Sequence, residues 1–277
     1  MKENLCNPCI VASLTTDIIL YVEFLPKRQQ DTKVLKTETR IGGCAYHVAK
    51  ACQIAPVFAP VGKGSNAQFV KDALIQEDFE CIMPTVDQDN GACYCLVEPD
   101  GERTFMAAHG AEYKYKEEWL DELEEYDLIY LSGIDMEVKE NHCIIDYCKE
   151  KDKPIFLSPG PRLEFLYCMD ELLDMHPILH MNRLECEILS KLPFEEGIRK
   201  LYERTKSLII VTDGEFGSYA YDGTLYYEPS EKAVIKNTIG AGDCHAGSCL
   251  HSLVERDDIQ TMLRKANDSA RLKLMNK

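Results

Sequence analysis

The feature that most constrains the fold is a regular alternation between short apolar runs and amphipathic segments, which starts near residue 127. We expect strands at 127–133, 154–158, 177–182 and 207–214, and helices at 137–152, 183–192 and 242–256. Strands that alternate with helices form parallel β-α-β units, because each helix carries the chain back across the sheet. The alternation predicts an α/β/α sandwich on a mostly parallel sheet. The length of 277 residues fits a single domain spanning residues 1–277.

Two stretches depart from this alternation. Residues 9–39 contain strand-like runs separated by polar gaps, and residues 92–108 resemble a hairpin around a Pro-Asp-Gly turn. We predict that segments near 9–39 and 92–108 form a small β-sheet lid over the carboxyl ends of the parallel strands. The alternative is an ordinary β elaboration with no gating role.

Composition narrows the classes of partner. The formal net charge of −16 disfavours nucleic-acid binding, because acidic chains repel phosphate backbones. No apolar stretch reaches 18 residues and the first residues lack a signal-peptide core, so we expect no membrane association and a cytoplasmic location. Thirteen cysteines lie mostly in apolar runs and are interpreted as reduced core thiols. Cys6 and Cys9 have the spacing of half a zinc site, but no second matching pair follows.

A glycine-rich turn at residues 237–247, NTIGAGDCHAG, carries the strongest chemical signal. Gly240 and Gly242 flank Ala241 and lead directly into Asp243 at an expected helix start. Such a start exposes unpaired amides that favour an anion, and glycines allow a ligand to approach closely. A carboxylate beside an anion is useful when it accepts a proton, as in phosphoryl transfer. The alternative is an aspartate that only complements the helix dipole.

The same turn resembles the C-terminal signature of the ribokinase-like (PfkB) family of sugar and nucleoside kinases. The segment IGGCAYHVAKA (41–51) resembles the N-terminal signature of that family, and GERTF (101–105) its lid hairpin. MNRLECEIL (181–189) resembles its Asn-x-x-Glu motif, and VTDGEFGSY (211–219) its Thr-x-Gly-x-x-Gly nucleotide turn. These segments follow the family order and span nearly the whole chain.

The resemblance implies a role for each matching residue. Asp243 would be the catalytic base, and the anion hole would be formed by the amides of Gly240, Ala241 and Gly242. The substrate would be bound by Thr15, Asp17, Gly42, Gly43, His47, Arg103 and Asp243. ATP would be bound by Asn182, Thr212, Gly214, Gly217, Gly240, Gly242 and Asn267. Asn182 and Glu185, three residues apart on one helix face, would hold Mg²⁺ through water. Taken singly, each also has a structural interpretation, such as a helix cap for Asn182.

Three positions depart from the family pattern. His47 stands where the family usually has asparagine, so contacts to the substrate can differ. Asn237 replaces an aspartate in a loop that binds a monovalent cation in many relatives, which weakens the expectation of a K⁺ site. Ser158 stands where an aspartate at a strand end is common.

We therefore predict an ATP-dependent kinase that phosphorylates a hydroxyl of a sugar or sugar-like alcohol. The alternatives are a nucleoside kinase, including a pseudouridine kinase, a phosphosugar kinase, and a catalytically idle sensor on the same fold. A nucleoside needs a slot for its base, for which Tyr46 and Phe105 are candidates. A phosphosugar needs clustered cations, and Lys63, Arg103 and Arg162 are scattered. A dinucleotide-dependent oxidoreductase would need Gly-x-Gly-x-x-Gly after an early strand. An exposed lid edge could also pair two chains as a homodimer.

Overall fold

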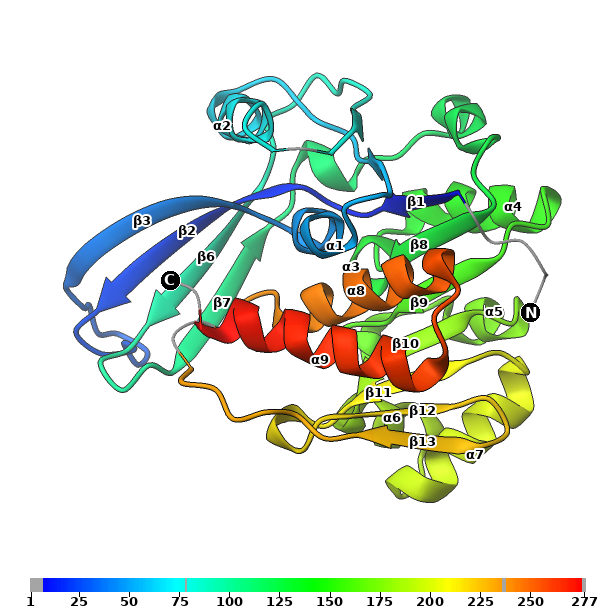
Figure 1. The fold of residues 1–277 in the computed structure, drawn as a ribbon. Coiled ribbons are helices and arrows are strands. Elements are labelled where there is room, and N and C mark those ends of the chain that lie inside the picture. Colours follow the sequence, from blue (N-terminus) through cyan, green and yellow to red (C-terminus); the bar gives the residue numbers. More distant parts are fainter. Residues whose placement is uncertain (1–6, 78, 236–237, 276–277) are drawn as a thin grey trace.

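A computed structural model describes residues 7–77, 79–235 and 238–275. Within these residues the chain forms a large sheet of nine strands in the order β13-β12-β11-β10-β9-β8-β1-β4-β5 (Figure 1). Its strands are β1 (Pro8–Val11), β4 (Val57–Phe58), β5 (Cys81–Ile82), β8 (Leu128–Ser132), β9 (Ile155–Ser158), β10 (Ile178–Asn182), β11 (Ile209–Thr212), β12 (Ser218–Tyr221) and β13 (Leu225–Glu228). All neighbours from β11 to β5 run parallel, and only the β11-β12-β13 edge is antiparallel. The predicted mostly parallel sheet is confirmed.

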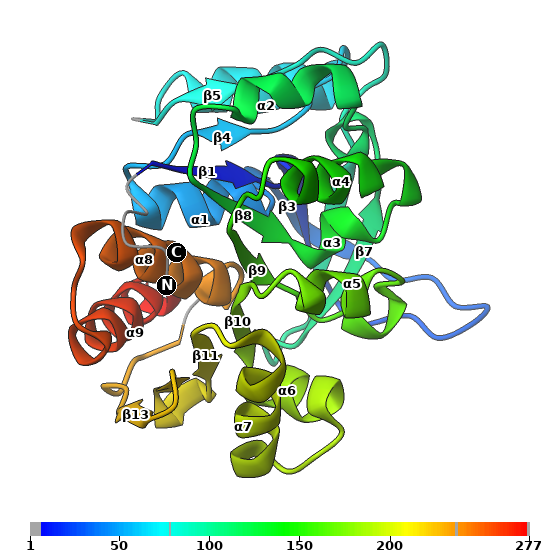
Figure 2. The ribbon, with the colours of Figure 1, turned by 90° about the vertical axis from the view of Figure 1, so that its right-hand side faces the viewer.

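Helices cover both faces of this sheet. They are α1 (Cys44–Cys52), α2 (Ser65–Leu74), α3 (Gly133–Met136), α4 (His142–Glu150), α5 (Met169–Asp174), α6 (Arg183–Ser190), α7 (Phe194–Thr205), α8 (Ala241–Glu255) and α9 (Ile259–Met275). Consecutive residues of the central strands belong to two separate cores: Ile129 packs with α4 to α7, whereas Tyr130 packs with α1, α2, α8 and α9. Figure 2 shows these two layers on opposite sides of the sheet. The predicted α/β/α sandwich is confirmed, and the apolar runs are continuous because central strands are buried on both faces.

The second sheet is smaller and stands beside the sandwich (Figure 1). It contains β2 (Thr15–Val22), β3 (Val34–Gly42), β6 (Ala92–Val97) and β7 (Arg103–Ala108) in the order β3-β2-β6-β7. Two antiparallel hairpins meet through the parallel pair of β2 and β6. One expected boundary was wrong: residues 9–11 of the segment 9–39 belong to β1, which lies in the large sheet. A short, fully buried apolar run has the same appearance in either sheet, so periodicity could not separate them.

The cysteines that the structure describes follow the expectation of reduced core thiols. The twelve cysteines that the structure describes are free, and eight of them are buried; Cys6 lies outside the described residues. Among the described helices, none is both long and apolar enough to cross a membrane.

A buried acid in α3 gives the fold a pH dependence. Asp135 is fully buried, and burial raises the pKa of its carboxyl to about 8, although Ser13 and Ser132 oppose this shift. The unfolded chain loses this proton near pH 4, whereas the folded chain keeps it to about pH 8. Folding therefore becomes less favourable as pH rises through that window. We expect urea unfolding of Asp135→Asn to lose less stability between pH 5 and pH 8 than unfolding of the wild type. An equal loss in both proteins would contradict the buried acid as the cause.

Candidate active site

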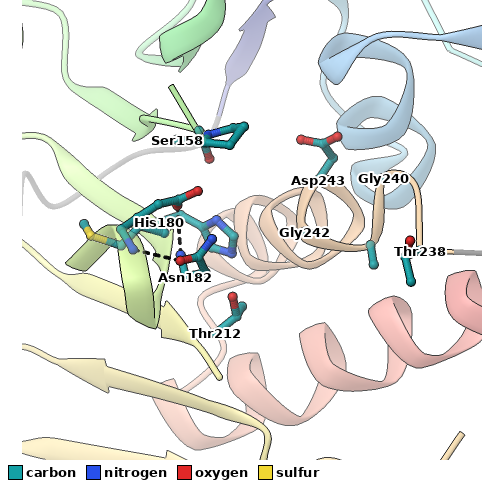
Figure 3. Close-up of a pocket in the computed structure, with 13 residues that line it drawn as sticks. Ser158, His180, Asn182, Thr212, Thr238, Gly240, Gly242 and Asp243 are labelled. Carbon is teal, nitrogen blue, oxygen red and sulfur yellow. Dashed lines mark hydrogen bonds between the residues drawn. The ribbon is translucent and has the colours of Figure 1, made fainter. Parts of the chain in front are cut away.

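A cleft of about 190 Å³ opens where three parallel strands end and α8 begins (Figure 3). In open α/β sheets, ligands bind at this carboxyl edge of the strands. The residues that line it are Ser158, Gly160, Pro161, His180, Met181, Asn182, Glu185, Thr212, Thr238, Gly240, Ala241, Gly242 and Asp243. Eight of these were singled out from the sequence, and the cleft brings them together from four separate segments.

One wall of the cleft is formed by the ends of β10 and β11. Asn182 and Thr212 are register partners on these parallel strands, so their side chains reach the edge together. Asn182 also caps α6: its side chain accepts from the Glu185 amide at 2.8 Å, and the Glu185 carboxylate accepts from the Asn182 amide at 3.0 Å. This reciprocal capping box fixes both side chains at the helix start. The cap interpretation of Asn182 is therefore correct, and it leaves both residues lining the cleft.

The opposite wall is the glycine turn at the start of α8. Gly240 has a left-handed backbone with φ 74°, and a Cβ added there would lie 2.5 Å from the His47 ring. Gly242 differs, because a Cβ there would meet no atom within 4 Å. Gly240 is thus required by the fold, whereas the space beside Gly242 is open to a ligand. Figure 3 shows Asp243 projecting from this first helical turn, across the cleft from Asn182 and Thr212.

The surroundings of Asp243 disfavour the ionised form of its carboxyl group. Burial, helped by the nearby charges of Asp17 and Glu185, raises its pKa to about 6. The Cys44 thiol, which hydrogen-bonds to it, and the Lys273 ammonium act in the opposite direction. A carboxylate with a raised pKa is a stronger proton acceptor than an ordinary aspartate, which suits a general base.

A second buried carboxylate, Asp17, lies at the sheet that adjoins this wall. Only 8% of Asp17 is exposed, and burial raises its pKa to about 6 against the opposing effects of Thr15 and Lys273. Thr15 donates its hydroxyl to Asp17 at 3.2 Å. A Cβ on Gly42 would lie 2.2 Å from the carboxyl carbon of Asp17, so only glycine leaves room for this rotamer. The absence of a Cβ on Gly43, whose φ is 91°, avoids the Ser13 carbonyl.

His47 contacts the glycine turn, and Lys273 lies close to His47 and to the carboxylates of Asp17 and Asp243. The His47 ring packs on Gly240, and burial lowers its pKa to about 3, so the ring is neutral. The Lys273 ammonium, in the last turn of α9, lies 3.4 Å from the His47 Nδ1. The same ammonium lowers the pKa of Asp17 and Asp243, as noted above. Lys273 is therefore a cation near both Asp17 and Asp243, and sequence reasoning did not identify it.

The small sheet touches the glycine turn through Arg103. Its guanidinium donates from Nη1 to the Thr238 hydroxyl at 2.8 Å. Ile239, in the same loop, packs against Ile19, Cys95 and Val97 on the inner side of the small sheet. Asn237, for which K⁺ binding was considered, lies outside the described residues.

Three expected nucleotide-binding residues do not line the cleft. Gly214 and Gly217 shape the turn after β11, with φ values of 57° and 106°. Asn267 donates its amide to the Glu228 carbonyl at 3.0 Å and is 9% exposed. Sequence reasoning missed Gly160, Pro161, His180, Met181 and Thr238 as lining residues. For the first four the signal was their position in, or just beyond, the expected strands at 154–158 and 177–182, and for Thr238 it was its place in the glycine-rich segment 237–247.

The capping pair also suits a hydrated magnesium ion. The side chains of Asn182 and Glu185 each accept one hydrogen bond in the capping box and retain further acceptor capacity at the cleft wall. Burial raises the pKa of Glu185, so a nearby dication would favour its ionised form. Oxygen donors that act through water are what Mg²⁺ prefers.

A sandwich of this topology, with a flanking small sheet and a glycine turn facing strand-end polar residues, defines a kinase of the ribokinase type. The family model described as pfkB family carbohydrate kinase matches residues 7–277. The chain belongs to this family of ATP-dependent carbohydrate kinases.

Individual relatives agree with this membership. The chain is similar to the uncharacterized sugar kinase YegV of Escherichia coli, at 29% identity over 88% of this chain and 81% of that one. Its fold resembles an Arabidopsis thaliana ribokinase solved with ribose and ATP, with a TM-score of 0.76, 18% identity, and 98% and 93% of the two chains covered. It also resembles a Burkholderia thailandensis nucleoside kinase solved with inosine, with a TM-score of 0.81, 17% identity, and 98% and 92% covered.

Proposed function

We propose that the chain transfers the γ-phosphoryl group of ATP to a hydroxyl of a free sugar or sugar-like alcohol held by Asp17. The observation that carries this proposal is the placement of Asp243, with the open turn at Gly242 on one side and the substrate-side carboxylate Asp17 close enough to raise its pKa. A base between an anion site and a polyol site is the arrangement that phosphoryl transfer requires.

The substrate side recognises hydroxyl groups. An ionised carboxylate only accepts hydrogen bonds, so Asp17 would accept from two neighbouring sugar hydroxyls. The neutral His47 ring can donate or accept one more. Asp243 would orient the reacting hydroxyl and take its proton as the new P–O bond forms and ADP leaves. The amides at the start of α8 would stabilise the charge on the transferred group.

The nucleotide side would use the wall formed by Thr212 and Asn182. Mg²⁺ held through water by Asn182 and Glu185 would neutralise charge on the phosphate oxygens. The small sheet, linked to the turn by Arg103 and Thr238, would exclude water from the reacting atoms and so limit wasteful hydrolysis of ATP.

The direct test measures ADP release with Mg-ATP over a panel of free sugars, sugar alcohols, sugar acids and nucleosides. We expect turnover to depend on an added polyol and to exceed the rate of ATP hydrolysis in its absence. ATP binding without turnover on any member of the panel would favour the sensor alternative. A chain that fails to bind ATP would contradict the proposed nucleotide site.

The pH profile should report the two raised carboxyls. Both Asp243 and Asp17 have a pKa of about 6 and must be ionised, one to take a proton and one to accept hydroxyl hydrogen bonds. We expect kcat/KM to be flat above pH 7 and to fall at least tenfold for each pH unit well below 6. A profile measured in constant ionic strength that stays flat down to pH 5 would contradict this assignment.

The contacts around the cleft favour the two alternative substrate classes, phosphosugars and nucleosides, less than a free sugar. Lys63 is paired with Asp87 and Arg162 with Glu137, so neither is gathered near Asp243 to hold a second phosphate. Tyr46 donates to Glu77 at 2.9 Å and packs with Phe79, and Phe105 is 53% exposed on the small sheet. A nucleoside remains a second candidate because the solved nucleoside kinase with inosine shares the fold. Pairing of two chains through the small sheet, and a cytoplasmic location, stay predictions.

A further inference from the structure

Three metal-ligating side chains meet in the interior between β10 and α8, directly behind the cleft. They are His180, His245 and Cys249, with exposed fractions of 5%, 2% and 0%. His245 and Cys249 are four residues apart on α8 and so project from the same helix face. His180 lies in the middle of β10 and also lines the cleft, where Figure 3 labels it. The proposed phosphoryl transfer uses none of the three.

The separations of their donor atoms suit a tetrahedral metal ion. The His180 Nε2 lies 2.9 Å from the His245 Nδ1, which lies 3.5 Å from the Cys249 Sγ, and all three atoms lie within 4.8 Å of one another. Zinc bonds of about 2.0–2.1 Å to nitrogen and about 2.3 Å to sulfur place two nitrogens about 3.3 Å apart and nitrogen and sulfur about 3.6 Å apart. The His245–Cys249 separation already matches, the two histidine nitrogens would move apart by about 0.4 Å, and the His180–Cys249 pair lies within the 4.8 Å limit.

We propose that His180, His245 and Cys249 form a binding site for a zinc-class metal ion, with the remaining coordination position facing the cleft. Two imidazoles and a thiolate select zinc, cobalt or copper rather than Mg²⁺, which prefers oxygen. Because His180 lines the cleft, the cleft supplies the path of entry and the water for the fourth position. The site is thus separate in chemistry from the oxygen donors of Asn182 and Glu185.

The proton balance of binding is defined. In the metal-free protein, one ring proton is shared between His180 and His245, and Cys249 is a thiol because burial raises its pKa. When the metal enters, the shared proton moves to an outward ring nitrogen, and the Cys249 proton leaves to solvent as sulfur binds the metal. Each ion bound therefore releases one proton, and both imidazoles stay neutral.

The test titrates the full chain with Co²⁺ in the absence of nucleotide, so that its outcome does not depend on the proposed kinase activity. We expect one ion per chain, a thiolate-to-cobalt charge-transfer band, and displacement of that band by Zn²⁺ but not by Mg²⁺. Cys249→Ser should abolish the band and weaken binding at least tenfold. Cys186→Ser, which changes an equally buried thiol on α6, should keep both. His142→Asn should also keep them, because the partly exposed group of His142, Asp146 and Glu171 has no sulfur ligand.

The cobalt titration distinguishes binding at this site from binding at other cysteines. Absence of the charge-transfer band in the wild type would overturn the proposal, as would a band that survives in Cys249→Ser. A band that is lost instead in Cys9→Ser would place the ion at the N-terminal cysteine pair and would equally overturn it. Circular dichroism checks that each variant is folded; should Cys249→Ser unfold, His180→Gln replaces it and must show the same loss of affinity.

Discussion

Asp243→Asn is expected to lower kcat by about 10³-fold while leaving the affinity for ATP within a few-fold of the wild type. The asparagine keeps the size of the side chain but cannot take the proton of the attacking hydroxyl. Such a decrease corresponds to about 4 kcal/mol of barrier. Turnover and ATP affinity should be measured separately, by ADP release and by equilibrium titration, because only the first depends on the base.

Asp213→Asn is the matched control for this variant. Asp213 follows β11 at the same edge of the sheet, and its carboxylate is paired with Arg183 at 2.8 Å rather than lining the cleft. We expect this variant to keep turnover within about threefold of the wild type, because it removes a carboxylate without removing the base. A comparable loss in both variants would mean that overall charge, not proton transfer, controls the rate.

Gly242→Ala should make the protein slightly more stable and at the same time a much weaker enzyme. An added Cβ meets no atom within 4 Å, and alanine is favoured over glycine in a helix by up to about 1 kcal/mol. The same methyl group occupies the space beside the amides that would hold the transferred phosphoryl group. We therefore expect kcat/KM for ATP to fall at least tenfold while the melting temperature stays equal or rises.

Gly240→Ala provides the contrast. That position combines a φ of 74° with a Cβ placed 2.5 Å from the His47 ring, so alanine there should lower both the melting temperature and the activity. Thermal unfolding and steady-state kinetics on the two variants distinguish a binding surface from a structural turn. Full activity in Gly242→Ala would exclude these amides as the anion hole.

The sequence predicted the sandwich well because its central strands are buried on both faces, which leaves uninterrupted apolar runs such as residues 128–131. It also singled out Asp243 from the glycine turn, and Asn182 and Glu185 from the resemblance to the family's Asn-x-x-Glu motif, and all three line the cleft. The boundary of the small sheet was wrong at residues 9–11, because a short apolar run does not indicate which strand it will pair with.

Other features of the site depend on contacts between distant segments. Lys273 reaches His47 only because α9 packs antiparallel to α8 and ends near the start of α8, and no local motif marks this lysine. His180 meets His245 through the packing of β10 against α8. Arg103 was expected at the substrate, and its partner Thr238 lies 135 residues away. Such pairings come from tertiary structure, so neither spacing nor composition could have predicted them.

The small sheet carries Asp17 on β2, Gly42 on β3 and Arg103 on β7, whereas Asn182, Thr212 and Asp243 all belong to the sandwich. If the proposed roles hold, most of the substrate-binding residues and the phosphate-binding residues belong to different parts of the chain, which can accumulate mutations separately. A lineage could exchange residues of the four-stranded sheet and acquire a new polyol without disturbing the groups that handle ATP. Directed evolution toward a different acceptor should accordingly enrich changes in residues 15–42 and 92–108 before any in the strands of the large sheet.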